Sequence, residues 1–292
     1  TTPDSNPAKN SATVSTTVGN VLTISCPAPV TVACSSSVPA YATNLTEFTN
    51  AGGTVAGGKA PYTVTWRGDQ IINQTCNNKY TIVRTYRATD AQNSTADCSQ
   101  TITVLDNIAP VITCPAAVTV TCASAVPAPA TNYAEFVALG GSASDNCGGT
   151  SNVSVTHEID EVSNQTCANK LTITRTYRAT DGCGNTSTCA QTFTVEDKTA
   201  PTFTVPANQS ISCNASTDPD FTGRPVDIVE NCSSASTIVS YTDVVTQGSC
   251  ANNSIITRTW KVSDQCGNYT EHVQTITLTD NTDPVITCPG NQ

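Results

Sequence analysis

The chain lacks methionine and has few aromatic or charged residues, and each shortage narrows the class of protein. Charged residues make up 12% of the 292 residues, with 13 basic against 23 acidic side chains, which leaves a net charge of −10. Without a basic patch to neutralise phosphates, the chain is not expected to bind nucleic acid. It has no apolar run long enough to cross a membrane. No Cys-x-x-Cys pair occurs, which excludes zinc ribbons and thioredoxin-type motifs.

What the sequence does contain is one unit that occurs three times. Copies of its most regular stretch are Tyr80–Asp106, Leu171–Asp197 and Ser254–Asp280. The position that opens each unit recurs at spacings of 88, 91 and 83, at Cys26, Cys114, Val205 and Cys288. This length suits an immunoglobulin-like sandwich and exceeds that of short solenoid repeats.

We therefore predict three modules, at residues 22–106, 107–197 and 198–280. Residues 1–21 are expected to be an extension or the end of a preceding module, with one strand at residues 12–18. Residues 281–292 are expected to be the start of a fourth module or a C-terminal docking stub.

Short segments of alternating polarity, separated by Gly, Asn and Pro, predict an all-β fold. The core face of the central strand is expected to carry Leu171, Ile173, Tyr177 and Ala179. Arg175 lies on the same face, where a charge is costly unless a carboxylate meets it. It is either a side chain that reaches the sandwich edge or half of a structural salt bridge. A short helical turn capped by Asn132, with a copy at Asn44, is the one expected exception to the strands.

Fifteen cysteines indicate disulfides, and therefore an extracellular or cell-surface protein. The second repeat has six: Cys114, Cys122, Cys147, Cys167, Cys183 and Cys189. The third repeat lacks the first and last of these positions, where Val205 and His272 stand. The first repeat lacks the counterparts of Cys147 and Cys183. Because a disulfide is lost as a pair, these absences predict which cysteines are bonded.

All the predicted bonds lie within a repeat. They are Cys26–Cys98 and Cys34–Cys76 in the first repeat, Cys114–Cys189, Cys122–Cys167 and Cys147–Cys183 in the second, and Cys213–Cys250 and Cys232–Cys266 in the third. Cys288 is left unpaired in this sequence. Its partner is expected in a fourth module, the alternative being a bond between chains. Each bridge should be worth about 4 kcal/mol in the chain-entropy model, which would compensate for small cores.

Several spaced motifs resemble the hyalin repeat (HYR), an immunoglobulin-like module of extracellular adhesion proteins. The motifs are Ile112-Thr-Cys-Pro115, Asp145-Asn146, Tyr177-x-Ala-x-Asp-x-x-Gly-Asn185, Cys189, Val195 and Asp197. The cysteine-rich form is similar to tandem repeats of large surface adhesin-type proteins from Bacteroidota. The resemblance covers residues 22–292 and implies an adhesive or stalk role, with no catalytic residue.

Acids recur beside the loops and junctions of each repeat and offer the oxygen ligands that Ca²⁺ prefers. The candidate ligands are Asp181, Asn185, Glu196, Asp197, Asp90, Asp106, Asp264 and Asp280. In the alternative interpretation, Asp181 and Asn185 form Asx turns and the junction acids cap strand ends. Calcium is the one cofactor that the sequence indicates.

No catalytic site is predicted, because His157 and His272 lie in different repeats and neither position recurs. We predict a non-enzymatic, elongated extracellular stalk of disulfide-stapled immunoglobulin-like β-sandwich modules, in a surface adhesin or a filament. The alternatives are a self-assembling filament subunit that uses terminal strands and a ligand-binding receptor ectodomain. Expected partners are further copies of the module or chain, and a surface or glycan ligand that the sequence does not identify.

Overall fold

The computed structural model describes residues 20–248, 253–280, 282–283 and 285–288. The predicted strand at residues 12–18, Cys250 and part of the segment 281–292 lie outside this range. The chain divides into two compact units, one of residues 1–111, 143–154 and 180–187, the other of residues 112–142, 155–179 and 188–292. Two loops of the second repeat thus belong to the same compact unit as the first repeat.

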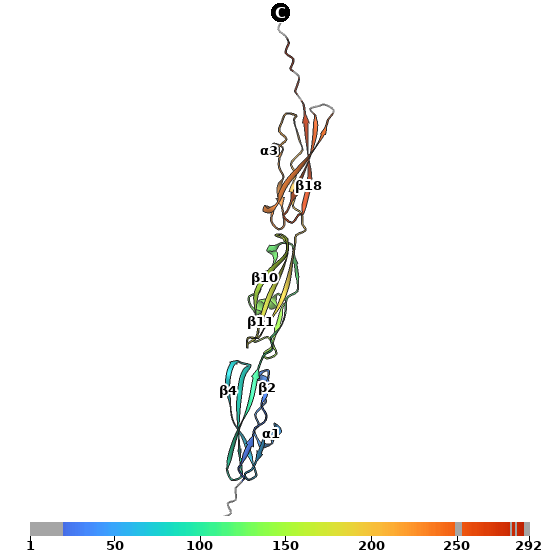
Figure 1. The fold of residues 1–292 in the computed structure, drawn as a ribbon. Coiled ribbons are helices and arrows are strands. Elements are labelled where there is room, and N and C mark those ends of the chain that lie inside the picture. The colour runs from blue at the N-terminus through green and yellow to red at the C-terminus, as the bar shows by residue number, and fades with distance from the viewer. Residues whose placement is uncertain (1–19, 249–252, 281, 284, 289–292) are drawn as a thin grey trace, which may run out of the picture. The chain divides into compact units, whose positions relative to one another are not determined.

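The same four-stranded sheet occurs in each repeat (Figure 1). In the first repeat its order is β2 (Val30–Val32), β6 (Thr95–Leu105), β5 (Lys79–Thr89) and β4 (Thr63–Cys76). In the second it is β8 (Val118–Val120), β12 (Thr186–Glu196), β11 (Lys170–Thr180) and β10 (Ser154–Cys167). In the third it is β14 (Gln209–Ser212), β18 (Tyr269–Thr279), β17 (Ser254–Ser263) and β16 (Ile238–Gln247). The short edge strand pairs parallel to its neighbour in each sheet.

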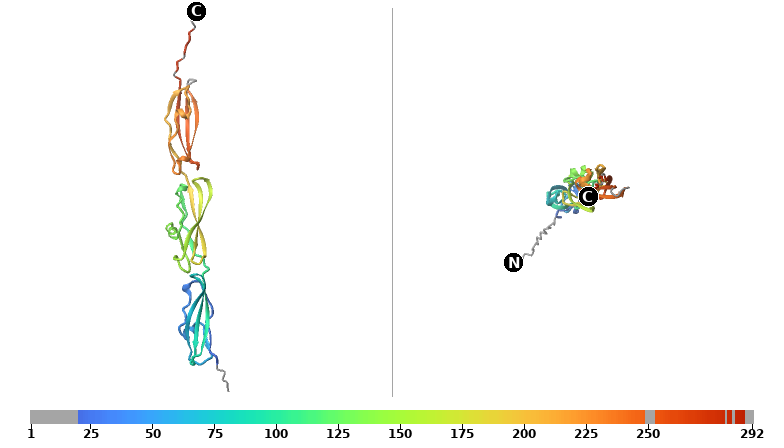
Figure 2. Two further views of the ribbon diagram at one scale, coloured as in Figure 1. Left: turned by 90° about the vertical axis from the view of Figure 1, so that its left-hand side faces the viewer. Right: turned by 90° about the horizontal axis from the view of Figure 1, so that it is seen from above.

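A smaller second layer accompanies each of these sheets. It consists of β1 (Thr23–Ser25) with β3 (Thr54–Ala56), β7 (Val111–Thr113) with β9 (Ser142–Ser144), and β13 (Thr202–Thr204) with β15 (Val226–Val229). Short helices complete the elements: α1 (Leu45–Asn50), α2 (Tyr133–Ala138) and α3 (Pro219–Thr222). In Figure 2 the strands of the first repeat, blue to cyan, run side by side along that repeat. The predicted all-β fold of tandem immunoglobulin-like sandwich modules is confirmed.

The predicted helical turns form where an asparagine N-cap begins them. The Asn44 side chain accepts a hydrogen bond from the Glu47 amide at 2.9 Å, and α2 begins in the same way at Asn132. The turn in α1 buries Phe48 completely in the core of the first repeat. Gly53 follows because a Cβ at this position would lie 2.3 Å from the Phe48 ring.

Each central strand buries an arginine that is paired with an aspartate on the adjacent edge strand. The pairs are Arg84–Asp69, Arg175–Asp160 and Arg258–Asp243. In the second repeat, Arg175 donates two hydrogen bonds of 2.8 Å to Asp160 and one of 2.7 Å to the Pro127 carbonyl. Its guanidinium also lies 4.8 Å from the centre of the Phe193 ring. Of the two interpretations of Arg175, the structural salt bridge is therefore correct.

This salt bridge predicts how stability depends on pH. Hydrogen bonding from Arg175 lowers the pKa of Asp160, partial burial opposes the shift, and His157 reinforces it. Because the folded-state pKa is depressed, the stabilisation is present above the unfolded pKa of about 4 and is lost as the pH falls through the folded value. We expect Asp160→Asn to lower the free energy of unfolding by about 2 kcal/mol at pH 7, less than for a fully buried pair because Asp160 is partly exposed.

Urea unfolding at pH 7 and pH 3 measures this difference, which should shrink at the lower pH. Asp97→Asn is the matched control, because Asp97 pairs with the exposed Arg87 and should change stability by under about 0.5 kcal/mol. Equal losses in the two variants would contradict the assignment.

Candidate functional site

Six disulfides occur among the described residues, and two of them lie within a repeat as predicted. Cys26–Cys98 and Cys114–Cys189 each have a Cα–Cα distance of 5.6 Å. Cys26 and Cys114 directly follow the first strand of the two-stranded sheet, β1 or β7. Their partners Cys98 and Cys189 lie in the four-stranded sheet, in β6 and β12. These two bonds therefore fasten the layers of a sandwich together.

The other four disulfides join one repeat to the next, which corrects the predicted pairing. They are Cys34–Cys147, Cys76–Cys183, Cys122–Cys232 and Cys167–Cys266. The predicted bonds Cys34–Cys76, Cys122–Cys167, Cys147–Cys183 and Cys232–Cys266 are wrong. Cys213 has a free thiol, and its predicted partner Cys250 lies outside the described residues.

The order of strands explains why the within-repeat pairing fails. Cys34 follows β2 and Cys76 ends β4, and these strands form opposite edges of one sheet. Three strand spacings of about 4.8 Å place the two edges roughly 14 Å apart, beyond the reach of a disulfide. The inference that a disulfide is lost as a pair holds for Cys114–Cys189. It fails for Cys147 and Cys183, because each of these bonds to a cysteine of the preceding repeat and not to the other.

Acidic side chains cluster beside each set of inter-repeat bonds. We define junction site 1 as Asp106, Asp145 and Asp181 with the bonds Cys34–Cys147 and Cys76–Cys183. We define junction site 2 as Asp197, Glu230 and Asp264 with the bonds Cys122–Cys232 and Cys167–Cys266. In each site the acid that ends one repeat is almost fully buried, at 2% exposure for Asp106 and 4% for Asp197.

In junction site 1, asparagine side chains cross from one repeat to the other. The Asn78 amide group donates to the Cys147 carbonyl at 3.3 Å. The Asn185 amide group donates to the Asp106 carbonyl at 3.3 Å and to the Asp181 carboxylate at 2.7 Å. The disulfides are thus accompanied by hydrogen bonds that join the same two repeats.

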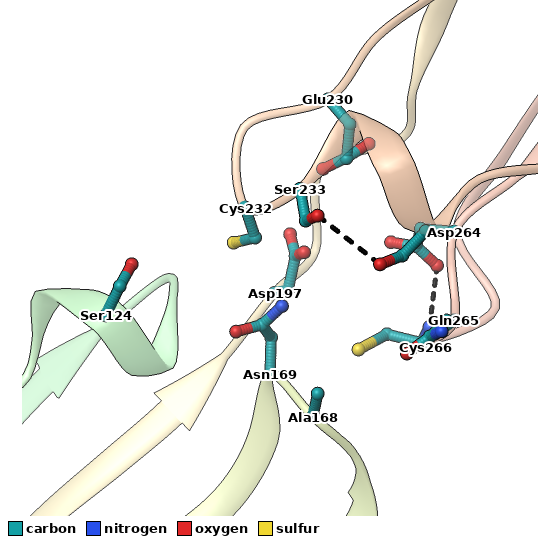
Figure 3. A pocket seen from close by; sticks show the side chains of 11 residues that line it. Ser124, Ala168, Asn169, Asp197, Glu230, Cys232, Ser233, Asp264, Gln265 and Cys266 are labelled. Carbon is teal, nitrogen blue, oxygen red and sulfur yellow. Dashed lines mark hydrogen bonds between the residues drawn. The ribbon is translucent and has the colours of Figure 1, made fainter.

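Junction site 2 has the same arrangement around a larger cavity. The carboxylates of Asp197, Glu230 and Asp264 line a pocket of about 230 Å³ (Figure 3). The Asn231 amide group donates to an Asp197 carboxylate oxygen at 3.3 Å, and that of Asn268 donates to the Asp197 carbonyl at 3.0 Å. The matching cavity in junction site 1 is about 40 Å³.

Each site contains one buried carboxylate oxygen that has no hydrogen-bond partner. These atoms are Asp145 Oδ1 and Glu230 Oε2. Burial raises the pKa of Asp106, and its two acidic neighbours raise it further. Burial also raises the pKa of Glu230, again reinforced by its two neighbours. Each cluster therefore concentrates negative charge around an oxygen that a proton or a cation could satisfy.

The sulfur atoms in these clusters do not extend the set of possible metal ligands. Single atoms of Asp106, Asp145 and Cys147 lie within 4.8 Å of one another, as do those of Asp197, Asp264 and Cys266. Both cysteines are disulfide-bonded, however, and so provide no thiolate. Carboxylate oxygens remain, which suits a hard cation such as Ca²⁺ better than zinc.

Four of the predicted calcium ligands lie in the junction sites, namely Asp106, Asp181, Asp197 and Asp264. Asp181 Oδ1 also accepts two backbone hydrogen bonds of 2.8 Å within its own loop, so the predicted Asx turn is present. Asp264 forms the same turn with Asn268. The remaining four predicted ligands have other roles. The Asn185 side chain donates a hydrogen bond to the Asp106 carbonyl, and Asp90 forms an Asx turn of the same kind as Asp181. Glu196 pairs with Lys198, and Asp280 directly follows β18.

Sequence reasoning did not include Asp145 and Glu230 among the ligands. A signal was present, because Asp145-Asn-Cys147 and Glu230-Asn-Cys232 repeat one motif with an acid at its first position. The first repeat has Gly57-Gly-Lys59 at this point and so lacks both the acid and the cysteine.

No family model and no curated protein matches this chain. Solved structures with some similarity include the protocadherin GammaB4 extracellular domain, at 14% identity and a TM-score of 0.32, covering 89% of this chain and 51% of that one. Another is human CDH23 EC21-23, at 12% identity and a TM-score of 0.29, covering 88% of this chain and 99% of that one. Similarity at this level identifies neither a family nor a ligand. No helix among the described residues is long and apolar enough to span a membrane.

The disulfide pairing can be tested directly by non-reducing peptide mapping of the oxidised chain. We expect peptides that link Cys34 to Cys147 and Cys167 to Cys266, because the sheet separates the cysteines within each repeat. The Cys26–Cys98 peptide is the internal control, since it forms in either pairing scheme. Recovery of a Cys34–Cys76 peptide would show that the inter-repeat bonds are wrong.

Proposed function

We propose that this chain is a segment of a non-enzymatic extracellular stalk, of a structural or adhesive kind. The observation that carries the proposal is that successive repeats are joined by two disulfides each. These bonds place covalent links at the junctions between repeats. Such joints are useful where a chain must keep its repeats together under load.

The bonds also create a short covalent path through the chain. From Cys26 the path follows the backbone to Cys34, crosses to Cys147, follows the backbone to Cys167 and crosses to Cys266. Only about 30 of the roughly 240 residues between Cys26 and Cys266 lie on this path, so the rest cannot be pulled out while the bonds remain. At about 3.5 Å per residue, unfolding could extend the oxidised chain by at most about 100 Å between these points.

The disulfides further support an oxidising environment outside the cell. Twelve bonded cysteines among the described residues are typical of secreted or surface proteins and rare in a reducing cytosol. We therefore place the stalk at the cell surface or in the extracellular space. The relationship to HYR modules of Bacteroidota surface proteins is part of this proposal.

A cation bound by the carboxylates of each junction site would add a further contact between the two repeats. Asp145 in junction site 1 and Glu230 in junction site 2 each have a buried carboxylate oxygen that accepts no hydrogen bond. We propose Ca²⁺ as the cation, because the donors are oxygens and the clusters concentrate negative charge. Its binding would add an ionic contact between repeats that the disulfides already join.

The two alternative functions stay predictions. A filament subunit would use terminal strands, and residues 1–19 lie outside the described range. A receptor ectodomain would require a ligand pocket in one repeat, and the pockets at the junction sites are lined mainly by polar side chains and disulfides.

Single-molecule force measurements test the stalk. When the chain is pulled by its ends, we expect the segment from Cys26 to Cys266 to lengthen by no more than about 100 Å when oxidised. After complete reduction the same segment should reach about 800 Å at about 3.5 Å per residue. The reduced and alkylated chain is the matched control. An oxidised chain that unravels one whole repeat at a time would overturn the proposed load path.

Calcium titration by calorimetry and thermal unfolding tests the junction cations. We expect binding with a Kd of up to about 1 mM and a rise in Tm, as for extracellular calcium modules. Asp145→Asn combined with Glu230→Gln should abolish both effects. Glu196→Gln is the matched control, because Glu196 pairs with Lys198 and should not contribute. If Ca²⁺ changes neither quantity in the unaltered chain, the proposed junction cations are wrong.

A further inference from the structure

The inter-repeat disulfides follow one rule of position. One partner ends or closely follows an edge strand of the preceding repeat, and we call Cys34, Cys76, Cys122 and Cys167 the outgoing cysteines. The other partner lies in a loop of the following repeat, and we call Cys147, Cys183, Cys232 and Cys266 the incoming cysteines. Both junctions follow this rule without exception.

The third repeat has an outgoing cysteine whose thiol is free. Cys213 follows β14, which pairs parallel to β18 as β2 pairs with β6 and β8 with β12. Its equivalents, Cys34 and Cys122, are both bonded to a neighbouring repeat. Cys213 itself is half-buried and unbonded. Cys250 has the sequence position of the second outgoing cysteine but lies outside the described residues, so the inference rests on Cys213.

Other parts of a junction accompany Cys213. Asp280 follows β18 directly, as Asp106 follows β6 and Asp197 follows β12. The Cys213 amide donates to the Thr279 carbonyl at 3.0 Å, so the cysteine lies next to the strand end that carries Asp280. The third repeat therefore has the outgoing half of a junction, with a cysteine and an acid at their usual positions.

We propose that this surface docks a fourth repeat of the same kind and that Cys213 forms a disulfide with its first incoming cysteine. The partner needs an Asp/Glu-Asn-Cys loop, like Asp145-Asn-Cys147, and an Asp-x-Cys-Gly-Asn loop, like that at 181–185. The sequence Ile286-Thr-Cys-Pro289 supports a partner in the same polypeptide, because Ile112-Thr-Cys-Pro115 opens the second repeat. This inference rests on the proposed stalk function, and it names the cysteine and the loop motifs that would form the next junction.

A second copy of this chain does not fit the surface. Its first repeat has Gly57-Gly-Lys59 and Gln92 where the incoming cysteines would stand. Its second and third repeats have all their incoming cysteines bonded already. A second copy therefore offers no unbonded cysteine at an incoming position, and the occupant that fits is a further repeat that carries both motifs.

The bond requires an oxidant as well as a partner. The two thiols lose two protons and two electrons as the sulfur–sulfur bond forms, and a disulfide oxidant such as oxidised glutathione takes them up and becomes two thiols. The exchange proceeds through a mixed disulfide with Cys213 or with its partner.

The test extends the full chain by a fourth repeat after Pro289. In one protein, residues 116–197 are added, which supply copies of Cys147 and Cys183. In the matched control, residues 28–106 are added, which supply neither. The outgoing cysteines of each added repeat are replaced by serine. After oxidation with glutathione, alkylation and non-reducing peptide mapping follow Cys213 and Cys288.

We expect Cys213 to be linked to the copied Cys147 in the first protein and to remain fully alkylated in the control. In both, a bond from Cys288 to the last cysteine of the added repeat shows that this repeat has folded. Free Cys213 in a first protein that has formed the Cys288 bond would overturn the proposal. A Cys213–Cys250 bond in the unextended chain would also overturn it, whether or not the added repeats fold. Neither outcome affects the Cys34–Cys147 and Cys122–Cys232 bonds that carry the stalk function.

Discussion

The geometry of a four-stranded sheet controls how this chain is held together. Its two cysteines at strand ends lie on opposite edges of the same sheet, too far apart to bond with each other. Each therefore bonds to a loop of the neighbouring repeat, at Cys147 and Cys183 in junction site 1. The junction is joined by two bonds that start from opposite edges of one sheet. The width of the sheet is thus what separates the two bonds of the junction.

The acids at each junction add electrostatic repulsion that opposes the joining of two repeats. Joining two repeats brings Asp106, Asp145 and Asp181 together in a partly dry space, and their mutual repulsion disfavours the closed joint. Disulfides can hold groups together against this repulsion because they are covalent. Asparagine amides then satisfy part of the charge, as Asn185 does for Asp181. A bound cation would turn the remaining repulsion into attraction, so the joint could respond to the calcium concentration outside the cell.

The sequence predicted the fold well because the fold depends on local patterns. Alternation in the central strand correctly indicated Tyr177 and Ala179 as core, and Asn132 correctly indicated a capped turn. Cysteine absences also predicted the within-repeat bond Cys114–Cys189, since both of its members are lost together in the third repeat. The same absences could not show that Cys147 and Cys183 belong to a different repeat from their partners. That distinction depends on strand order across the sheet, which a repeat pattern does not encode. Asp145 was missed as a ligand for the same reason, because it meets Asp106 only when two repeats are joined.

The overlap of the disulfides also determines what a protease can achieve. Every peptide bond between Cys26 and Cys266 is spanned by at least one disulfide, and the segments between repeats are spanned by two. A single cut anywhere in this range therefore leaves one covalent molecule rather than two fragments. A chain built in this way would stay in one covalent piece after an isolated cut, and several cuts would be needed to release a fragment.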